Sequence, residues 1–163
     1  MMKRIFDVFS ALLGIIILFP IGLIISCIIK LSSKGPVFFI QERVGKDGEI
    51  FKMIKFRSMF VIQNSYSTIS VKGDVRITKI GDVLRRYKLD ELPELWNVLV
   101  GEMSLVGPRP DIPGYADKLK GEDRNILKLR PGLTGPASLK YANEETILQN
   151  KKNPVKYNDE VIY

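Results

Sequence analysis

The chain has 163 residues, 45% of them hydrophobic and 26% charged, which favours one modest folded domain and excludes two large ones. Its net charge of +7 favours an anionic partner, such as nucleic acid, a phospholipid surface or a phosphorylated small molecule. The absence of histidine and the single cysteine, Cys27, exclude a Ser-His-Asp triad, a Cys-His pair, a histidine metal site and an internal disulfide. Catalysis would therefore need Asp, Glu, Lys, Arg, Tyr or a carboxylate-bound hard cation such as Mg2+.

Residues 11–29 form an apolar run without charge, with Pro20 close to its middle. The run is barely long enough to cross a bilayer, which takes roughly 20 residues. A secretory signal peptide is disfavoured, because the run exceeds the usual apolar core and no small-residue cleavage site follows it. Basic residues flank both ends and place both on the cytoplasmic side: Lys3, Arg4, Lys30 and Lys34. We therefore predict a re-entrant membrane helix, a helix-break-helix at Pro20, with a straight transmembrane helix as the alternative.

After Gly35 and Pro36 the pattern changes from helical to extended. Residues 37–42 and 50–57 are rich in β-branched and aromatic side chains, and residues 44–48 between them supply turn residues. This arrangement predicts a β-hairpin. Lys55 and Arg57 alternate with apolar residues in its second strand, so these cations either form a solvated strand face or bind phosphates.

The most basic part of the chain follows a polar stretch, residues 63–73, which we expect to be a surface loop. A helix with one apolar side is predicted from about Lys79 to Lys88. The cations of this part are Arg76, Lys79, Arg85, Arg86 and Lys88. They either balance the helix dipole or bind an anion beside the acids that follow.

Two adjacent acids, Asp90 and Glu91, open a short amphipathic segment. We expect a helix that begins at these acids, because Asp90 is a good N-cap and Pro93 is tolerated in a first turn. Apolar residues recur at helical spacing and should face inward: Leu92, Leu95, Trp96 and Leu99. A helix start favours carboxylates and attracts phosphate, so the acids are either simple caps or a catalytic pair. Glu94 is assigned only the role of a first-turn acid.

About twenty residues after the acids, an arginine stands between two prolines, Pro108-Arg109-Pro110. Residues 111–121 are predicted as helix and loop, and residues 123–129 and 144–149 as short helices. There are no internal repeats and no phosphate-cradling glycine motif. The predicted fold class is α+β, mainly helical with a small β-hairpin.

Short motifs spread over nearly the whole chain fit one known pattern. They are Lys3-Arg4-Ile5-Phe6-Asp7, Gly35-Pro36-Val37-Phe38-Phe39, Gln41-Glu42-Arg43-Val44-Gly45, Lys55-Phe56-Arg57-Ser58-Met59, Leu89-Asp90-Glu91-Leu92-Pro93, Trp96-Asn97-Val98-Leu99, Met103-Ser104-Leu105-Val106-Gly107-Pro108-Arg109-Pro110 and Arg130-Pro131-Gly132-Leu133-Thr134-Gly135. Together they resemble the monotopic phosphoglycosyl transferases, the bacterial sugar transferase family that starts glycan assembly on polyprenol phosphate. The Asp-Glu-Leu-Pro segment combined with the Pro-Arg-Pro loop makes the resemblance highly specific.

The resemblance implies a two-step exchange that is magnesium-dependent. Asp90 would attack the sugar-bearing phosphate of a nucleotide diphosphate sugar, most often a UDP-sugar, and release UMP. Polyprenol phosphate would then take the phosphosugar from the aspartate. Glu91 would be the second member of the dyad and would hold Mg2+ with Asp90. The expected substrate-binding residues are Arg85, Arg109, Pro108, Pro110, Lys55 and Arg57, with the two prolines stiffening the loop of Arg109.

The resemblance also implies a place in the cell. A soluble donor and a lipid-bound acceptor require a site at a membrane surface, so we expect residues 1–34 to be embedded in the bacterial cytoplasmic membrane. Residues 35–163 would form a catalytic domain on its cytoplasmic face. The chain departs from the family pattern in having Phe19 before Pro20, where Ser-Pro is usual. It also ends at Tyr163, earlier than is usual, so its C-terminal end is expected to be truncated.

Other classes of function are compatible with the same composition. A membrane-anchored binding protein could use the basic face for nucleic acid or anionic lipid, with the acids as caps only. Aromatic residues are sparse near the basic cluster, which argues against single-stranded nucleic acid, and we expect no nucleic-acid partner. An inactive scaffold of the same fold is a further alternative. The sugar and the oligomeric state stay open, a homodimer included.

Overall fold

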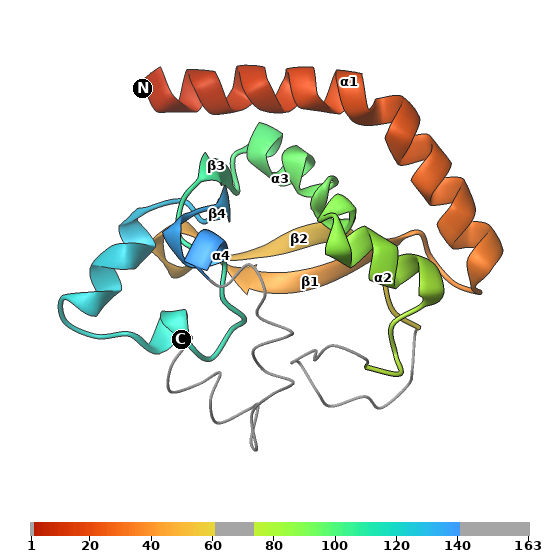
Figure 1. The fold of residues 1–163 in the computed structure, drawn as a ribbon. Helices are drawn as coiled ribbons and strands as arrows, with labels where there is room; N and C mark the ends of the chain where they lie inside the picture. Colours follow the sequence, from red (N-terminus) through yellow and green to blue (C-terminus); the bar gives the residue numbers. More distant parts are fainter. Residues whose placement is uncertain (1, 61–73, 141–163) are drawn as a thin grey trace.

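The structure, a computed structural model, describes residues 2–60 and 74–140. The loop predicted at 63–73 and the helix predicted at 144–149 lie outside the described residues. A long, bent N-terminal helix runs over the top and down the right-hand side of a body made of short helices and two small sheets (Figure 1). In chain order, with short 3-10 helices written as η, the elements are α1 (Met2–Ser32), β1 (Phe38–Val44), η1 (Lys46–Gly48), β2 (Ile50–Phe56), α2 (Lys79–Arg86), η2 (Leu89–Glu91), α3 (Glu94–Val100), β3 (Ser104–Val106), η3 (Ala116–Lys118), η4 (Asp123–Lys128), β4 (Gly132–Thr134) and α4 (Pro136–Lys140).

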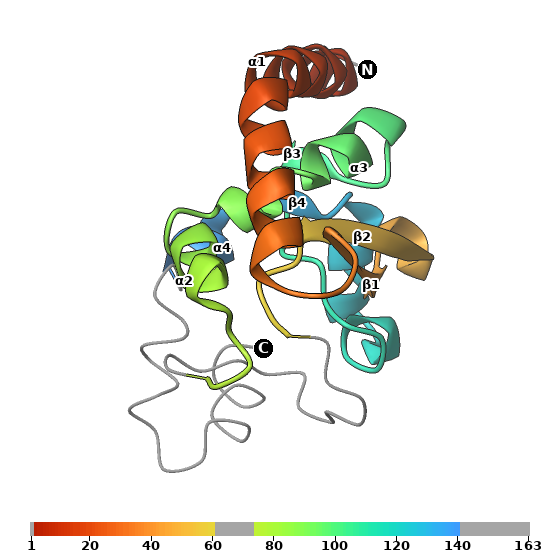
Figure 2. The ribbon, with the colours of Figure 1, turned by 90° about the vertical axis from the view of Figure 1, so that its right-hand side faces the viewer.

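Helix α1 is continuous through Pro20 and bends in its middle, so its two halves run in different directions (Figures 1 and 2). A proline removes one backbone hydrogen bond and crowds the preceding turn, which bends a helix while the neighbouring turns stay bonded. The break predicted at Pro20 is therefore a bend within one helix. A re-entrant path through a membrane stays a prediction.

The bend lets each half of α1 pack on a different part of the body. In the N-terminal half, Ala11 is buried in a cluster with Leu95 and Val98 of α3. In the C-terminal half, Ile25 and Ile29 are buried together with residues of β2 and α2, namely Phe56 and Leu84. The view of Figure 2 accordingly places α2 and the hairpin on either side of this half.

The opposite side of α1 leaves a long apolar surface exposed. Its exposed large side chains are Ile5, Phe6, Phe9, Leu12, Leu13, Ile16, Ile17, Phe19, Ile21, Leu23, Ile24, Ile28 and Leu31. A continuous apolar patch of this kind marks an interaction surface in a folded protein. By length and composition, α1 is also the one described helix that could cross a membrane.

The predicted hairpin is confirmed: β1 and β2 pair antiparallel, from Phe38 opposite Phe56 to Val44 opposite Ile50. Asn97 of α3, which is fully buried, fixes the hairpin to the helix. Its side-chain amide donates to Lys52 O at 2.8 Å, and its side-chain oxygen accepts from Ile54 N at 3.1 Å. The backbone edge of β2 is thereby satisfied by a side chain of the helix that follows the acids.

The second sheet, in which β3 and β4 pair parallel, was not predicted. The backbones approach so closely that a Cβ atom on Gly107 would lie 2.4 Å from Arg130 O. Gly132 N donates to Pro108 O at 2.7 Å, and Gly107 N donates to Thr134 O at 3.0 Å. These hydrogen bonds of the β3–β4 sheet therefore fix Gly107 and Pro108, the residues that lead into the Pro-Arg-Pro loop.

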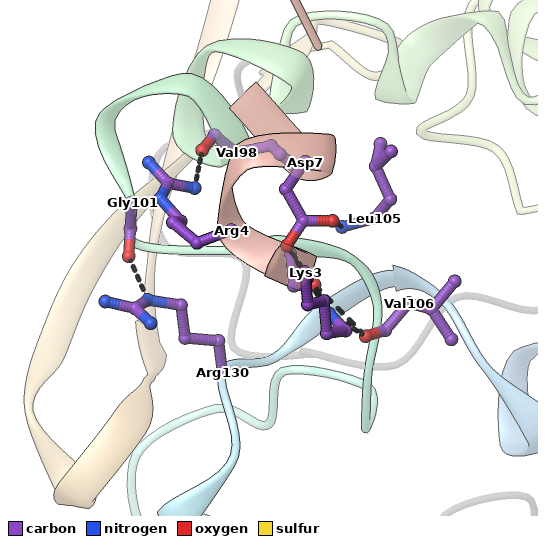
Figure 3. A network of polar contacts seen from close by, with 9 residues as sticks. Lys3, Arg4, Asp7, Val98, Gly101, Leu105, Val106 and Arg130 are labelled. Carbon is purple, nitrogen blue, oxygen red and sulfur yellow. Dashed lines mark hydrogen bonds and ion pairs between the residues drawn. The ribbon is translucent and has the colours of Figure 1, made fainter. Parts of the chain in front are cut away.

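The first turns of α1 carry two polar anchors (Figure 3). The guanidinium of Arg4 donates to the last carbonyls of α3, to Val98 O at 2.6 Å and Leu99 O at 2.9 Å. Just beyond, Arg130 donates to Gly101 O at 2.7 Å. The C-terminal end of α3 is thus held by cations, which also suits the negative end of the helix dipole.

Asp7 is the second anchor, and it is buried (Figure 3). Its carboxylate accepts from Ser104 Oγ at 2.8 Å and from Leu105 N at 3.2 Å. Lys3 donates to Val106 O at 3.1 Å. The start of α1 is therefore tied to β3, the strand that leads into the Pro-Arg-Pro loop.

Candidate active site

The two predicted acids do not start α3. Asp90 and Glu91 lie in the separate turn η2, and α3 begins three residues later, at Glu94. The residue before η2, Lys88, has a left-handed backbone with φ of 56°, which is uncommon for a residue other than glycine. The left-handed Lys88 sets η2 apart from α2, whereas Leu92 and Pro93 keep right-handed helical backbone angles between η2 and α3. The acids sit on a tight turn between α2 and α3.

The inward face of α3 also differs from the prediction. Trp96 was expected to face inward, but it is 54% exposed. Leu95 is buried as expected, and the other buried positions are Glu94, Asn97 and Val98. Because α3 is covered by both α1 and the hairpin, its buried face includes positions on either side of the predicted one.

Asp90 is buried, with 6% of its surface exposed, and its Oδ1 has no hydrogen-bond partner among the described residues. Burial raises the pKa of this carboxyl above its usual value, and the neighbouring Glu91 carboxylate raises it further. Lys55, Arg85 and Lys88 act in the opposite direction. The cations around Asp90 therefore help to keep a buried carboxylate ionised.

Lys55, which reaches the acids from β2, lies between two carboxylates. Its Nζ is 2.9 Å from Glu91 Oε1 and 3.1 Å from Glu94 Oε1. Burial tends to raise the pKa of Glu91, but the Lys55 ammonium, with Lys88 and Arg109, lowers it overall. Conversely, burial disfavours the Lys55 ammonium, and Glu94 and Glu91 outweigh it and raise the Lys55 pKa. The lysine is thus held as a cation by the acids.

Glu94, assigned from the sequence only the role of a first-turn acid, lies within the site beside Lys55. It is only 3% exposed, and burial raises its pKa to about 7 in spite of the opposing charge of Lys55. Its Oε1 makes the ion-pair contact with Lys55 but no hydrogen bond of regular geometry. Two signals in the sequence could have revealed it: apolar neighbours on both sides, and a three-residue spacing from Glu91.

Two arginines act on these acids from other elements. Arg85, in the last turn of α2, is half-buried; its Nη1 lies 3.4 Å from Ser58 Oγ, and its charge acts on Asp90. Arg109 is exposed, and its charge acts on Glu91. Both predicted phosphate ligands thus lie within electrostatic reach of the dyad.

The loop that carries Arg109 is fixed from two sides. On the hairpin side, Arg43 donates to Pro110 O at 3.0 Å, and Val44 N donates to Asp111 O at 2.8 Å. On the other side lies the β3–β4 sheet described above. Pro110 is buried and Pro108 half-buried, while Arg109 between them is exposed. The prolines therefore hold an arginine that faces solvent on a rigid loop.

Arg57 is placed differently from the other predicted site residues. It is buried, and its guanidinium donates to Lys34 O at 3.0 Å and Ser33 O at 2.8 Å, just after the end of α1. These are the contacts of a helix C-terminal cap. Lys55 thus contacts Glu91 of the dyad. Arg57 instead binds backbone carbonyls just after the end of α1. A substrate-binding role for Arg57 stays a prediction.

The comparisons with known proteins agree with the resemblance. The family model described as bacterial sugar transferase matches residues 1–161. The chain is 39% identical over 160 residues to a UDP-glucose:undecaprenyl-phosphate glucose-1-phosphate transferase of Klebsiella pneumoniae, covering 95% of this chain and 34% of that protein. It is 41% identical over 145 residues to a UDP-N-acetylgalactosamine-undecaprenyl-phosphate N-acetylgalactosaminephosphotransferase of Aeromonas hydrophila. This match covers 84% of this chain and 33% of that protein.

A shorter relative matches along most of its own length. The chain is 44% identical over 147 residues to an exopolysaccharide production protein of Rhizobium leguminosarum bv. phaseoli, which covers 85% of this chain and 74% of that protein. By contrast, it spans about a third of the length of the Klebsiella protein. The chain belongs to the bacterial sugar transferase family.

Proposed function

We propose that the chain transfers a sugar 1-phosphate from a UDP-sugar to polyprenol phosphate and so starts the assembly of a polysaccharide or glycoconjugate. In the first step, an Asp90 carboxylate oxygen attacks the sugar-bearing phosphorus of the donor. The bond from this phosphorus to the bridging oxygen breaks, and UMP leaves with that oxygen. An oxygen of polyprenol phosphate then attacks the same phosphorus, the bond to Asp90 breaks, and polyprenol diphosphate sugar is formed.

The observation that carries this proposal is the state of Asp90. Its carboxylate is buried, and Oδ1 has no hydrogen-bond partner in the described part of the chain. A buried oxygen without a donor costs stability, and such groups are kept where they have a use. Lys55, Arg85 and Lys88 favour its charged form. A carboxylate oxygen without a donor, on a tight turn and beside cations that favour its charged form, is suited to nucleophilic attack on phosphorus.

Phosphoryl transfer also needs donors for the charge that spreads over the phosphate oxygens. Arg109 on its rigid loop and Arg85 at the end of α2 supply planar guanidinium groups on the side of the dyad. We assign both to the donor diphosphate. Lys55 contributes positive charge while paired to Glu91 and Glu94.

The residues present fit a magnesium ion that arrives with the substrate. Mg2+ is usually bound by one or two carboxylates together with substrate phosphates. Asp90 and Glu91 offer hard carboxylate oxygens side by side on the turn η2. Within residues 2–60 and 74–140, no group of three or more His, Cys, Asp or Glu could hold a metal by itself. Asp90 and Glu91 would therefore hold Mg2+, which neutralises charge on the diphosphate when bound.

A lipid acceptor requires the site to lie at a membrane. The exposed apolar side of α1 supports an embedded segment at residues 1–34, and its bend at Pro20 suits entry into one leaflet and return to the same side. The remaining residues would then face the cytoplasm as the catalytic domain. Two relatives carry UDP-sugars and undecaprenyl phosphate in their names, which supports the same donor and acceptor classes for this chain.

The test is UMP release from a panel of UDP-sugars, with polyprenol phosphate and Mg2+ present. We expect release with at least one sugar, and a loss of at least about 10³-fold in Asp90→Asn, which keeps the side-chain size but removes the nucleophile. Asp123→Asn is the matched control, because Asp123 is exposed on η4. Substantial activity in Asp90→Asn would exclude the mechanism.

A further inference from the structure

The Lys55 ammonium is shared by two carboxylates that come from different elements. Glu91 belongs to η2 and lies 2.9 Å from Lys55 Nζ, and Glu94 is the first residue of α3 and lies 3.1 Å from it. Glu94 is almost fully buried. The Coulomb attraction between two charges is stronger when they are shielded from water than at the surface, although burial also costs each charge its hydration. Glu94 is therefore a strong determinant of where the ammonium lies.

Asp90 is the third carboxylate near Lys55, but its contacts differ from those of Glu91 and Glu94. In the described residues, Lys55 forms ion pairs with Glu91 and Glu94 and none with Asp90. Asp90 Oδ1 meanwhile has no hydrogen-bond donor. The ammonium is close enough for its charge to act on Asp90, but it does not bind the oxygen that would attack.

We propose that Glu94 is a positioning residue that holds the Lys55 ammonium on the Glu91 side of the site and keeps it off the nucleophilic oxygen of Asp90. The inference rests on the proposed function, in which Asp90 is the nucleophile. Without the Glu94 carboxylate, Lys55 has two acidic neighbours left, Glu91 and Asp90. The ammonium then shifts toward Asp90, and an ion-paired oxygen is a weaker nucleophile.

The first test is kinetic. Glu94→Gln keeps the size of the side chain and removes its charge, and we expect kcat for UMP release to fall about tenfold with KM for the UDP-sugar within about twofold. Glu94→Asp, which keeps the charge, should recover part of this loss. Glu122→Gln is the control, because Glu122 is exposed beside η4. Wild-type kcat in Glu94→Gln would overturn the inference.

A double-mutant cycle separates positioning through Lys55 from a general structural role. Lys55→Met is measured with and without Glu94→Gln. If Glu94 acts through Lys55, the double variant loses no more activity than Lys55→Met alone, because the two residues are coupled. Independent, multiplying losses would contradict the inference.

A third measurement needs no turnover. Glu94 Oε1 lies 3.1 Å from Lys55 Nζ, so loss of this contact leaves the amine less tightly held and more accessible to a reagent. Modification of Lys55 by an amine-specific reagent, followed by mass spectrometry, should be severalfold faster in Glu94→Gln and near the wild-type rate in Glu94→Asp. An unchanged rate in Glu94→Gln would overturn the placement of Lys55. Failure of the wild-type protein to release UMP would instead overturn the proposed function.

Discussion

Asp90 and Glu91 could be selected from the sequence because they are adjacent, follow a basic helix and belong to a specific motif. Glu94 was not selected, since an acid in the first turn of a helix is common and its partner, Lys55, comes from a distant strand. Trp96 was misplaced for a related reason: helical spacing identifies a face, but the covering elements decide which face is buried. Helical spacing alone therefore did not predict which residues of α3 are buried.

The raised pKa of Glu94 has a consequence for stability. Its folded pKa of about 7 exceeds the ordinary glutamate value of 4.5, so the folded state binds the proton more tightly than the unfolded state. The contribution of Glu94 to the free energy of unfolding is fully present below pH 4.5 and is lost as the pH rises toward 7. The groups that act on it are Lys55, Glu91 and Asp90.

We therefore expect wild-type protein to lose stability relative to Glu94→Gln as the pH rises from 4.5 to 7, by on the order of 1–3 kcal/mol. Unfolding of both proteins in detergent, measured across this range, gives the difference. The control, Glu122→Gln, should track the wild type at every pH. A constant difference between wild type and Glu94→Gln would mean that folding does not raise the pKa of Glu94.

Among the elements, those with a long sequence pattern were predicted well, and those of only a few residues were not. The apolar run and the alternating strands gave α1 and the hairpin, with ends close to those predicted. The strands β3 and β4 have three residues each, too few for a period, and are positioned by contacts between distant glycines. The separation of α2 from η2 depends on the left-handed backbone of Lys88, a residue type that gives no signal for it.

Asn97 holds two of these elements together and provides the prediction at this scale. Asn97→Ala removes the partners of Lys52 O and Ile54 N and leaves a cavity at a fully buried position. We expect the free energy of unfolding to fall by about 2–4 kcal/mol. Denaturant unfolding measures it, with Asn125→Ala on the exposed side of η4 as the control. A loss no larger than that of the control would show that Asn97 does not fix the hairpin to α3.

For the whole molecule, the apolar helix and the site form one unit. Arg4 binds the end of α3, and Asp7 binds β3, so the start of α1 is tied to the helix after the dyad and to the strand before the Arg109 loop (Figure 3). The bend at Pro20 then brings the second half of α1 against β2 and α2. A membrane that holds α1 would therefore also fix the orientation of the site.

The topology of α1 can be tested by cysteine labelling from each side of the membrane. In a Cys27→Ser background, single cysteines replace Ser10 and Ser32, near the two ends of the apolar run. The re-entrant path predicts that both positions react from the cytoplasmic side only. Labels on opposite faces would mean that α1 spans the bilayer.

The central claim is that Asp90 carries the phosphosugar, and the most direct measurement is mass spectrometry of the protein incubated with a UDP-sugar and Mg2+ without polyprenol phosphate. We predict an added mass equal to one sugar phosphate, located on the peptide that contains Asp90, which disappears when polyprenol phosphate is added. Asp90→Asn should give no adduct. Release of UMP by the wild-type protein without any adduct at Asp90, or with one on another residue, would contradict the mechanism.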